Sequence, residues 1–200
     1  MIGNVFGLLF HPKSQWQAIA NRGHFSMFTA VLYTVVLAII PAVAWYYGVT
    51  SIGWTVGEEG ERIRMTQDSA SVIILLFYLT MVVVVCAIGY MIHWMSKTYG
   101  SDSNSAKGIA IAGFSATPLF IAGAIGFLPV FWVALVIGVA AVSYAVYLLY
   151  TGIPIVMHIP EERGFLFSSA VIAVCLVFLI AIMTASVILW EYGAAPSFTD

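Results

Sequence analysis

The longest uncharged stretch of the sequence, residues 108–160, reads GIAIAGFSATPLFIAGAIGFLPVFWVALVIGVAAVSYAVYLLYTGIPIVMHIP. It contains no Asp, Glu, Lys or Arg, and its single His is His158. One membrane-crossing helix needs about 20 apolar residues, so this stretch is long enough for two crossings. A Gly and a Pro near its middle, in Gly126-Phe127-Leu128-Pro129, are typical of a tight turn. The stretch therefore predicts a membrane-buried helical hairpin with the arms Ala106–Leu128 and Pro129–Tyr150.

The composition of the whole chain also indicates a membrane protein. Apolar residues make up 62% of it and charged residues only 8%, whereas soluble domains carry about 25% charged residues. The surface must therefore face lipid. The net charge of −2 and the absence of a basic cluster argue against a nucleic-acid partner. We predict an all-α integral membrane protein, built as a single membrane domain over residues 1–200.

Five apolar stretches are long enough to cross a membrane, and they predict five transmembrane helices. They cover residues 25–47, 69–95, 106–128, 129–150 and 165–190. We expect Pro41 to kink the first span, where neighbouring helices can satisfy the freed carbonyl. We expect Pro154 and Pro160 to end the fourth helix.

The sequence also predicts local structure in two segments outside the spans, residues 2–23 and Gly48–Asp68. Residues 2–23 mix apolar and polar groups, which favours an interfacial N-terminal segment with Trp16 as its anchor in the headgroup region. A second interpretation, an ordinary cap packed on the end of the helix bundle, does not exclude the first. The connection Gly48–Asp68 is long enough for a hairpin or a short re-entrant piece, and Gly53 and Gly57 indicate turns there.

The positive charges predict the orientation, because loops on the cytoplasmic side carry an excess of Lys and Arg. With a cytoplasmic N-terminus, the outer segments hold only Arg62 and Arg64. The inner segments then hold the remaining cations, Lys13, Arg22, Lys97, Lys107 and Arg163. This distribution favours a cytoplasmic N-terminus and a periplasmic C-terminus.

The third span carries small residues four positions apart, at Ala112 and Ala116 and at Gly113 and Thr117. Small residues at this spacing let helices in lipid approach closely. Pro118 interrupts the hydrogen-bond ladder, and Ser115 or Thr117 can partly compensate. Two interpretations stay open, a kinked packing helix and a hinge or broken helix that lines a path.

The fourth span repeats this spacing at Ala134 and Gly138. It therefore predicts a tight pair formed by the third and fourth helices.

The polar side chains give little indication of a catalytic or metal-binding site. Ser115 and His93 are candidates for a nucleophile and a base, but His93 lies near a helix end and no Gly-x-Ser-x-Gly elbow occurs. The histidines His11, His24, His93 and His158 are all near span ends at spacings that match no metal-ligand pattern. Cys86 and Cys175 lie within apolar runs, which favours packing over a disulfide. We expect neither enzymatic chemistry nor a cofactor.

Mid-membrane ionisable residues are absent from all five predicted spans. Transporters driven by protons usually carry such a residue, since it costs several kcal/mol unless function requires it. A proton-coupled pump is therefore disfavoured. A passive path for water, lipid or a neutral solute stays open.

Two motifs resemble the Yip (Ypt-interacting protein) family domain. They are Leu8-Leu9-Phe10-His11-Pro12 followed by Trp16, and Ala112-Gly113-Phe114-Ser115-Ala116-Thr117-Pro118-Leu119-Phe120. The segments 50–54, 147–154 and 188–193 are similar to bacterial inner-membrane members of that family. The resemblance implies a five-helix domain in the bacterial inner membrane with a cytosolic N-terminus.

The resemblance says less about partners. Eukaryotic members of the family are linked to prenylated Rab-type GTPases, a role that a longer cytosolic N-terminal region would serve. We therefore expect the fold to carry over and the GTPase partner not to. The function we predict is that of a membrane-organising or interaction protein that engages lipid, a membrane-protein partner or a second copy of itself. The alternative is a channel or transporter for a neutral or lipid-like substrate.

Overall fold

The computed structural model describes residues 2–21, 26–56, 61–128 and 130–199. The helices of this described chain are α1 (Ile2–Phe10), α2 (Pro12–Ala20), α3 (Met27–Tyr47), α4 (Gln67–Ser96), α5 (Ser105–Ser115), α6 (Thr117–Ala122), α7 (Phe131–Met157) and α8 (Glu161–Leu189). Its strands are β1 (Trp54–Val56), β2 (Glu61–Met65) and β3 (Phe198–Thr199). The helical membrane fold predicted from the sequence is confirmed, with a small sheet added to it.

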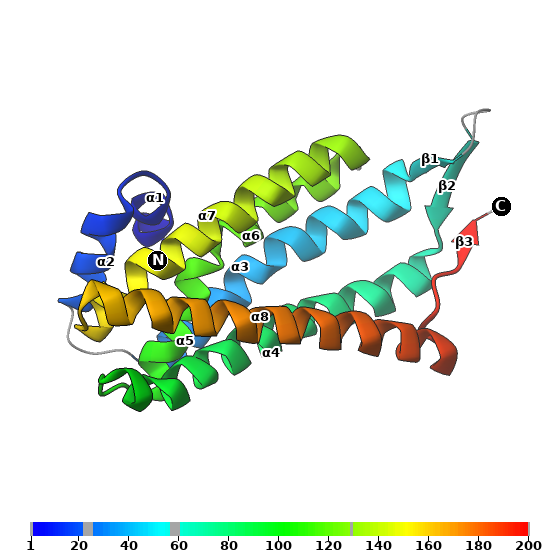
Figure 1. Cartoon of the computed structure of the whole chain (residues 1–200). Coiled ribbons are helices and arrows are strands. Elements are labelled where there is room, and N and C mark those ends of the chain that lie inside the picture. The colour runs from blue at the N-terminus through cyan, green and yellow to red at the C-terminus, as the bar shows by residue number, and fades with distance from the viewer. Residues whose placement is uncertain (1, 22–25, 57–60, 129, 200) are drawn as a thin grey trace.

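Four of these helices, α3, α4, α7 and α8, are each long and apolar enough to cross a membrane. The remaining crossing is broken, since α5 and α6 with the following 3₁₀ turn Gly123–Phe127 meet at a bend of 41°. This broken helix starts near Ser101, whose hydroxyl donates to the Met157 carbonyl (2.8 Å) at one end of the bundle. It reaches Gly126, where an added Cβ would lie 2.7 Å from the Trp45 nitrogen, at the other end. The described chain thus has five candidate crossings when the bent pair counts as one, with α1 and α2 at one end of the bundle and the strands and C-terminus at the opposite end (Figure 1).

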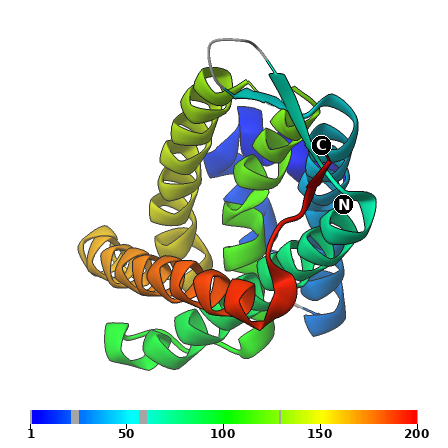
Figure 2. The ribbon, with the colours of Figure 1, turned by 90° about the vertical axis from the view of Figure 1, so that its right-hand side faces the viewer.

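Helix α5 is the centre of the bundle (Figure 2). Of its eleven residues, all but Ser105 and Lys107 are buried. Its small side chains let the neighbouring helices come close, and the tightest approach is to α4. A Cβ added at Gly108 would overlap the carbonyl oxygen of Gly89, and one added at Gly89 would overlap Ile109. Lipid tails are as apolar as the side chains, so the burial of apolar surface does not drive helices together in a membrane. Close van der Waals packing between backbones stabilises them instead.

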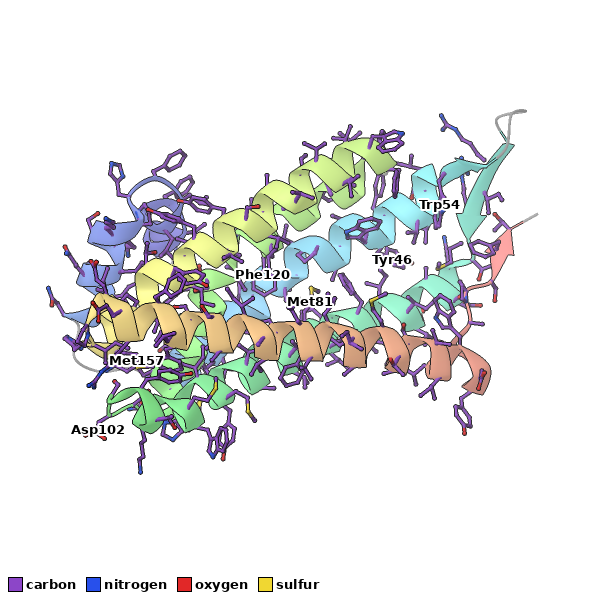
Figure 3. The ribbon with its side chains drawn as sticks, viewed as in Figure 1. Tyr46, Trp54, Met81, Asp102, Phe120 and Met157 are labelled. Atoms are coloured by element: carbon purple, nitrogen blue, oxygen red, sulfur yellow. The ribbon has the colours of Figure 1, made fainter. Side chains whose placement is uncertain are left out.

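The outer helices expose large apolar side chains over most of their length. In α8 the buried residues are Gly164, Phe167, Ser168 and Val171, all in its first half. Val177, Ile180 and Met183 in its second half are each more than 60% exposed. The side chains in Figure 3 radiate outward along the bundle between Asp102 at one end and Trp54 at the other. Such a surface is stable only in a bilayer.

Helix α7 differs from the prediction at both of its ends. A Cβ added at Gly138 would meet nothing within 4 Å, and Ala134 is only partly covered. The predicted close pairing through Ala134 and Gly138 is therefore wrong. The helix also continues through Pro154 to Met157 and ends at His158, whose φ of 55° is left-handed. Pro154 therefore does not end the helix, and Gly164 of α8 packs against its ring.

The N-terminal segment forms two short helices that pack on the bundle. Trp16 of α2 is 0% exposed, and its indole covers Gly152 of α7, where a Cβ would lie 2.6 Å from the ring. The prediction that Trp16 anchors the segment in the headgroup region is wrong, and the alternative, a packed cap, is the structure. Phe6 and Phe10 of α1 stay exposed, at 59% and 70%. The apolar groups that remain free to enter a headgroup layer are thus on α1.

The connection between α3 and α4 contains a β-hairpin, one of the two predicted structures. β1 pairs antiparallel with β2, with Trp54 opposite Ile63. Gly53, with φ of 67°, makes the turn into β1, whereas Gly57 lies outside the described residues. The all-α prediction missed β3, which joins β2 with Phe198 opposite Met65. The Trp54 and Phe198 rings meet edge to face at 6.3 Å, so the C-terminal residues help to close this end of the bundle.

Comparing Gly108→Ala with Gly138→Ala tests the central packing. Gly108→Ala forces a methyl group against a backbone carbonyl, and overpacking costs about 1–3 kcal/mol. Gly138→Ala meets open space and gains helix propensity, up to about 1 kcal/mol. Thermal unfolding in detergent should show a lower Tm for Gly108→Ala and an unchanged or higher Tm for Gly138→Ala. Equal Tm values for the two variants would contradict the packing described here.

Candidate functional site

The break between α5 and α6 lies at Ala116. Pro118 stands in the first turn of α6, where its missing N–H removes a bond from the ladder. The N–H groups of Leu119 and Phe120 both donate to the Ala116 carbonyl, at 3.0 and 3.2 Å. The interruption predicted from Pro118 is present. The flexing of a hinge there stays a prediction.

A buried hydrogen bond joins this break to α3. The hydroxyls of Tyr33 and Thr117 lie 2.7 Å apart, and the two side chains are 3% and 0% exposed. Both side chains sit in an apolar interior, where each hydroxyl would be costly without the other. Thr117 was a candidate from the sequence, and Tyr33 was missed. A hydroxyl in the middle of an apolar span was the signal that could have found it.

Gly113 lies just before the break and faces the inside of the bundle. A Cβ added there would lie 2.7 Å from the Thr34 hydroxyl and 3.8 Å from the Tyr33 ring. Gly113 therefore allows α5 to approach α3. It is buried, so it cannot contact an external partner.

Phe114 links three parts of the chain. Its ring meets Tyr33 of α3 at 4.6 Å and Trp16 of α2 at 6.1 Å, both edge to face. Close by on α7, the Tyr144 hydroxyl is shared between the Leu8 and Leu9 carbonyls of α1, at 3.0 and 2.8 Å. These contacts fix α1 and α2 to the membrane helices.

Pro41 is buried within α3 and packs against the second half of the broken helix. A Cβ added at Gly123 would contact the Pro41 ring, at 3.1 Å from its Cα. One turn further on, Gly126 meets the α3 backbone at Ala44 and Trp45. The third span thus has α3 as a close partner in addition to α4.

The polar groups proposed from the sequence for catalysis do not form a pair. Ser115 Oγ and His93 Nδ1 are both buried without a hydrogen-bond partner, as is Trp16 Nε1. No hydrogen bond therefore joins Ser115 to His93. Within the described ranges no three His, Cys, Asp or Glu side chains gather as a metal site, and Cys86 and Cys175 are free thiols. His24 lies outside the described residues.

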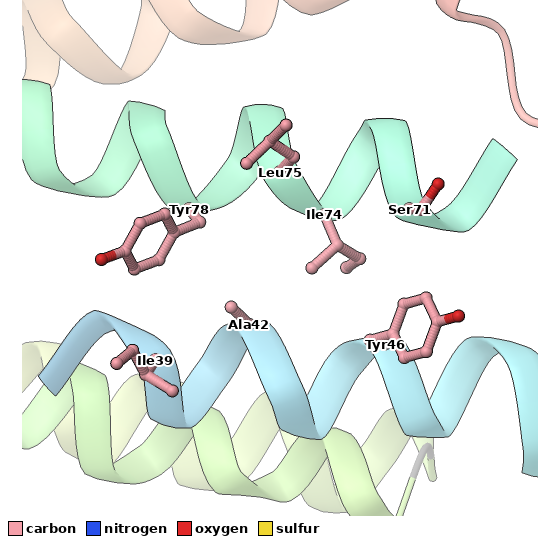
Figure 4. Close-up of a pocket in the computed structure, with 7 residues that line it drawn as sticks. All are labelled: Ile39, Ala42, Tyr46, Ser71, Ile74, Leu75 and Tyr78. Atoms are coloured by element: carbon pink, nitrogen blue, oxygen red, sulfur yellow. The ribbon is translucent and has the colours of Figure 1, made fainter. Parts of the chain in front are cut away.

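A groove of about 400 Å³ separates α3 from α4 on the surface of the bundle. It is lined by Ile39, Ala42 and Tyr46 of α3 and by Ser71, Ile74, Leu75 and Tyr78 of α4. Ile74 and Tyr78 point from α4 towards α3, and Ala42 points back across the gap (Figure 4). The Tyr78 hydroxyl donates to the Val35 carbonyl (3.2 Å) and closes one end. Sequence reasoning missed this groove, because it depends on how the two helices diverge.

A double-mutant cycle at Tyr33 and Thr117 tests the buried hydrogen bond. Tyr33→Phe and Thr117→Val each leave one hydroxyl buried without its partner, which costs about 1–3 kcal/mol. The double variant should cost less than the sum of the two, with a coupling of about 0.5–3 kcal/mol. Unfolding in detergent measures the coupling, and strict additivity would contradict the contact. Tyr150→Phe, which breaks a part-buried bond to Ser169 at 2.8 Å, is a control with a smaller expected cost.

Comparison with known proteins agrees with this architecture. Residues 6–182 match the Yip1 domain family. The chain is 32% identical over 192 residues to "Inner membrane protein YohC" of Escherichia coli strain K12, covering 96% of this chain and 98% of that protein. The protein of the same name from Escherichia coli O6:H1 matches with the same identity and coverage. No solved structure gives a significant match. The chain therefore belongs to the Yip1 domain family, as a multi-pass protein of the bacterial inner membrane.

Proposed function

We propose that the protein organises the membrane or its components, engaging lipids and other membrane proteins through its embedded surface, without enzymatic chemistry. The observation that carries this proposal is the exposure of α7 and α8. Trp132 and Val136 of α7 are 71% and 68% exposed, and Val177 and Ile180 of α8 are 66% and 65% exposed. The first half of α7 and the second half of α8, which carry these residues, contribute little to the core, so their apolar area is available to lipids or to a partner's helices.

The polar side chains of the interior support the same proposal. The Tyr33–Thr117 pair, the Tyr144 bonds to α1 and the Ser101 bond to Met157 each join two segments of the chain. Their hydroxyls are therefore occupied in holding the bundle together. A substrate-converting site would need such groups to converge on an open space.

The alternative function is passage of a neutral or lipid-like substrate. The observation that favours it is the break at Ala116, with Pro118 beside it and Ser115 Oγ buried without a partner. Broken helices at membrane depth are tolerated where they are buried in protein or line a water-filled cavity. A rearrangement at this break could open a path past Ser115.

The proposal includes the orientation of the chain, with the N-terminus cytoplasmic and the C-terminus periplasmic. Arg62 and Arg64 of β2 lie at the end of the bundle that holds the sheet. The other described cations belong to the opposite end: Lys13 in α2, Lys97 after α4, Lys107 in the first turn of α5 and Arg163 in the first turn of α8. The positive-inside rule assigns the richer end to the cytoplasm.

Reconstitution separates the two functions. In liposomes that contain the purified protein, we expect no flux of glycerol or of fluorescent phospholipid above protein-free liposomes, for wild type and for Pro118→Ala. Native mass spectrometry from nanodiscs should show wild-type protein that retains phospholipid or forms a defined oligomer. A flux that wild type supports and Pro118→Ala or Ser115→Ala alters would replace the proposal with the alternative.

Cysteine labelling tests the orientation. In a background with Cys86 and Cys175 replaced by Ala, Tyr192→Cys should react with a membrane-impermeant maleimide in intact spheroplasts. Tyr192 follows α8 at the sheet end and is 85% exposed. Asp102→Cys, at the opposite end, should react only after the membrane is opened. The reverse pattern would place the N-terminus outside.

A further inference from the structure

We propose that the groove between α3 and α4 is a phospholipid-binding site, which holds one acyl chain between the helices and the glycerophosphate group at the end near the sheet. This inference rests on the proposed function and assigns its lipid contact to one place. The groove is walled by four aliphatic side chains and two tyrosine rings (Figure 4). Its volume of about 400 Å³ lies within the roughly 300–1,000 Å³ that small-molecule sites occupy.

The groove opens sideways, towards the surface of the bundle that faces lipid. Ile39 and Leu75 on its rims are 46% and 58% exposed, whereas Ala42 at its floor is 8% exposed. Both walls belong to membrane-spanning helices. An acyl chain can therefore enter from the bilayer without passing through water. A polar solute would find no hydrogen-bonding groups along the aliphatic part of the walls.

The two ends of the groove differ in polarity, as the acyl chain and the headgroup of a phospholipid do. At the inner end, Tyr78 is bonded to the Val35 carbonyl, and this bond closes the space between the helices. At the outer end stand the hydroxyls of Tyr46, one residue before α3 ends, and of Ser71, in the first turns of α4. Tyrosine is enriched where acyl chains meet headgroups. The polarity of the groove thus follows that of a lipid, apolar inside and hydroxylated at the mouth.

Charged side chains of both signs stand at the sheet end of the bundle, where the groove has its mouth. Arg62 and Arg64 of β2 are the cations that the described chain has at this end, and the strand leads directly into α4. Arg64 packs over Gly53, where an added Cβ would lie 2.8 Å from its Cγ, and its side chain is exposed. Arginine side chains bind phosphate oxygens well. The described acidic groups at this end are Glu61 beside Arg62 in β2, Asp68 in the first turn of α4 and Glu191 beyond α8.

A second copy of the chain is a poorer occupant. A stable protein–protein interface buries at least about 1,200 Å². The groove has only seven lining residues, too few for such an area, and the gap is narrow enough for Tyr78 to bridge it. A single flexible hydrocarbon chain matches this space better than a helix.

The test combines photo-cross-linking with native mass spectrometry on the full-length protein in nanodiscs. The probe is a phosphatidylethanolamine with a diazirine in the middle of one acyl chain. We expect adducts concentrated on the peptides that contain Ile39–Tyr46 and Ser71–Tyr78. Ala42→Phe fills the floor of the groove and Leu75→Trp fills it from the exposed rim, and each should lower adduct yield and lipid retention several-fold. The second variant changes an exposed residue, so it guards against a fold defect in the first.

Matched controls add the same bulk elsewhere. Ala185→Phe and Leu179→Trp lie on the exposed half of α8 and should leave adduct yield and lipid retention unchanged. If wild type retains lipid but neither groove variant differs from its control, the site is wrong while the proposed function stands. Wild type that retains no lipid and supports solute flux would overturn both. Adducts between two protein chains at Leu75→Cys, formed by a cysteine cross-linker, would replace the lipid with a second copy.

Discussion

The backbone contact of α4 with α5 is the constraint on which the rest of the bundle depends. Gly89 and Gly108 lie so close that neither position has room for a Cβ. In water, the hydrophobic effect would hold helices together at a larger separation. In lipid that driving force is absent, and close packing of backbones has to replace it. With α5 held against α4, its other faces become the surfaces on which α3 and α7 pack, and this explains why nearly every residue of α5 is buried.

Close packing of small residues also accounts for the broken crossing. Pro118 removes one backbone bond and turns the helix by 41°, and this turn brings the second half against α3 at Pro41 and Gly123. The Tyr33–Thr117 bond holds the two helices together at the turn. Buried hydroxyl pairs specify one arrangement strongly, because any other leaves two groups unsatisfied. The break can therefore be a fixed element of the core, and the proposed function needs no motion there.

Different parts of the structure meet lipid in different ways. The end that holds α1 and α2 is tied by Trp16, Phe114 and Tyr144, whereas the sheet end is closed by a few strand residues and the Trp54–Phe198 contact. Between them, α3 and α4 are joined at Tyr78, and the groove lies between these two helices. This arrangement offers lipid a groove on the surface of the bundle.

The sequence by itself determined the class, the number of crossings, their approximate bounds and the break near Pro118, since these follow from local composition and from proline's missing N–H. It also predicted the hairpin between α3 and α4 as one of two possibilities. Only the tertiary structure decided which of the small residues pack against a neighbouring helix. Gly138 has the same spacing as Gly113 but faces open space, because spacing selects a face of a helix and does not say what lies opposite. It also decided that Trp16 is core rather than anchor, that β3 joins the hairpin, and that a groove opens between α3 and α4. Each of these depends on segments distant in the chain, whose meeting no local pattern encodes.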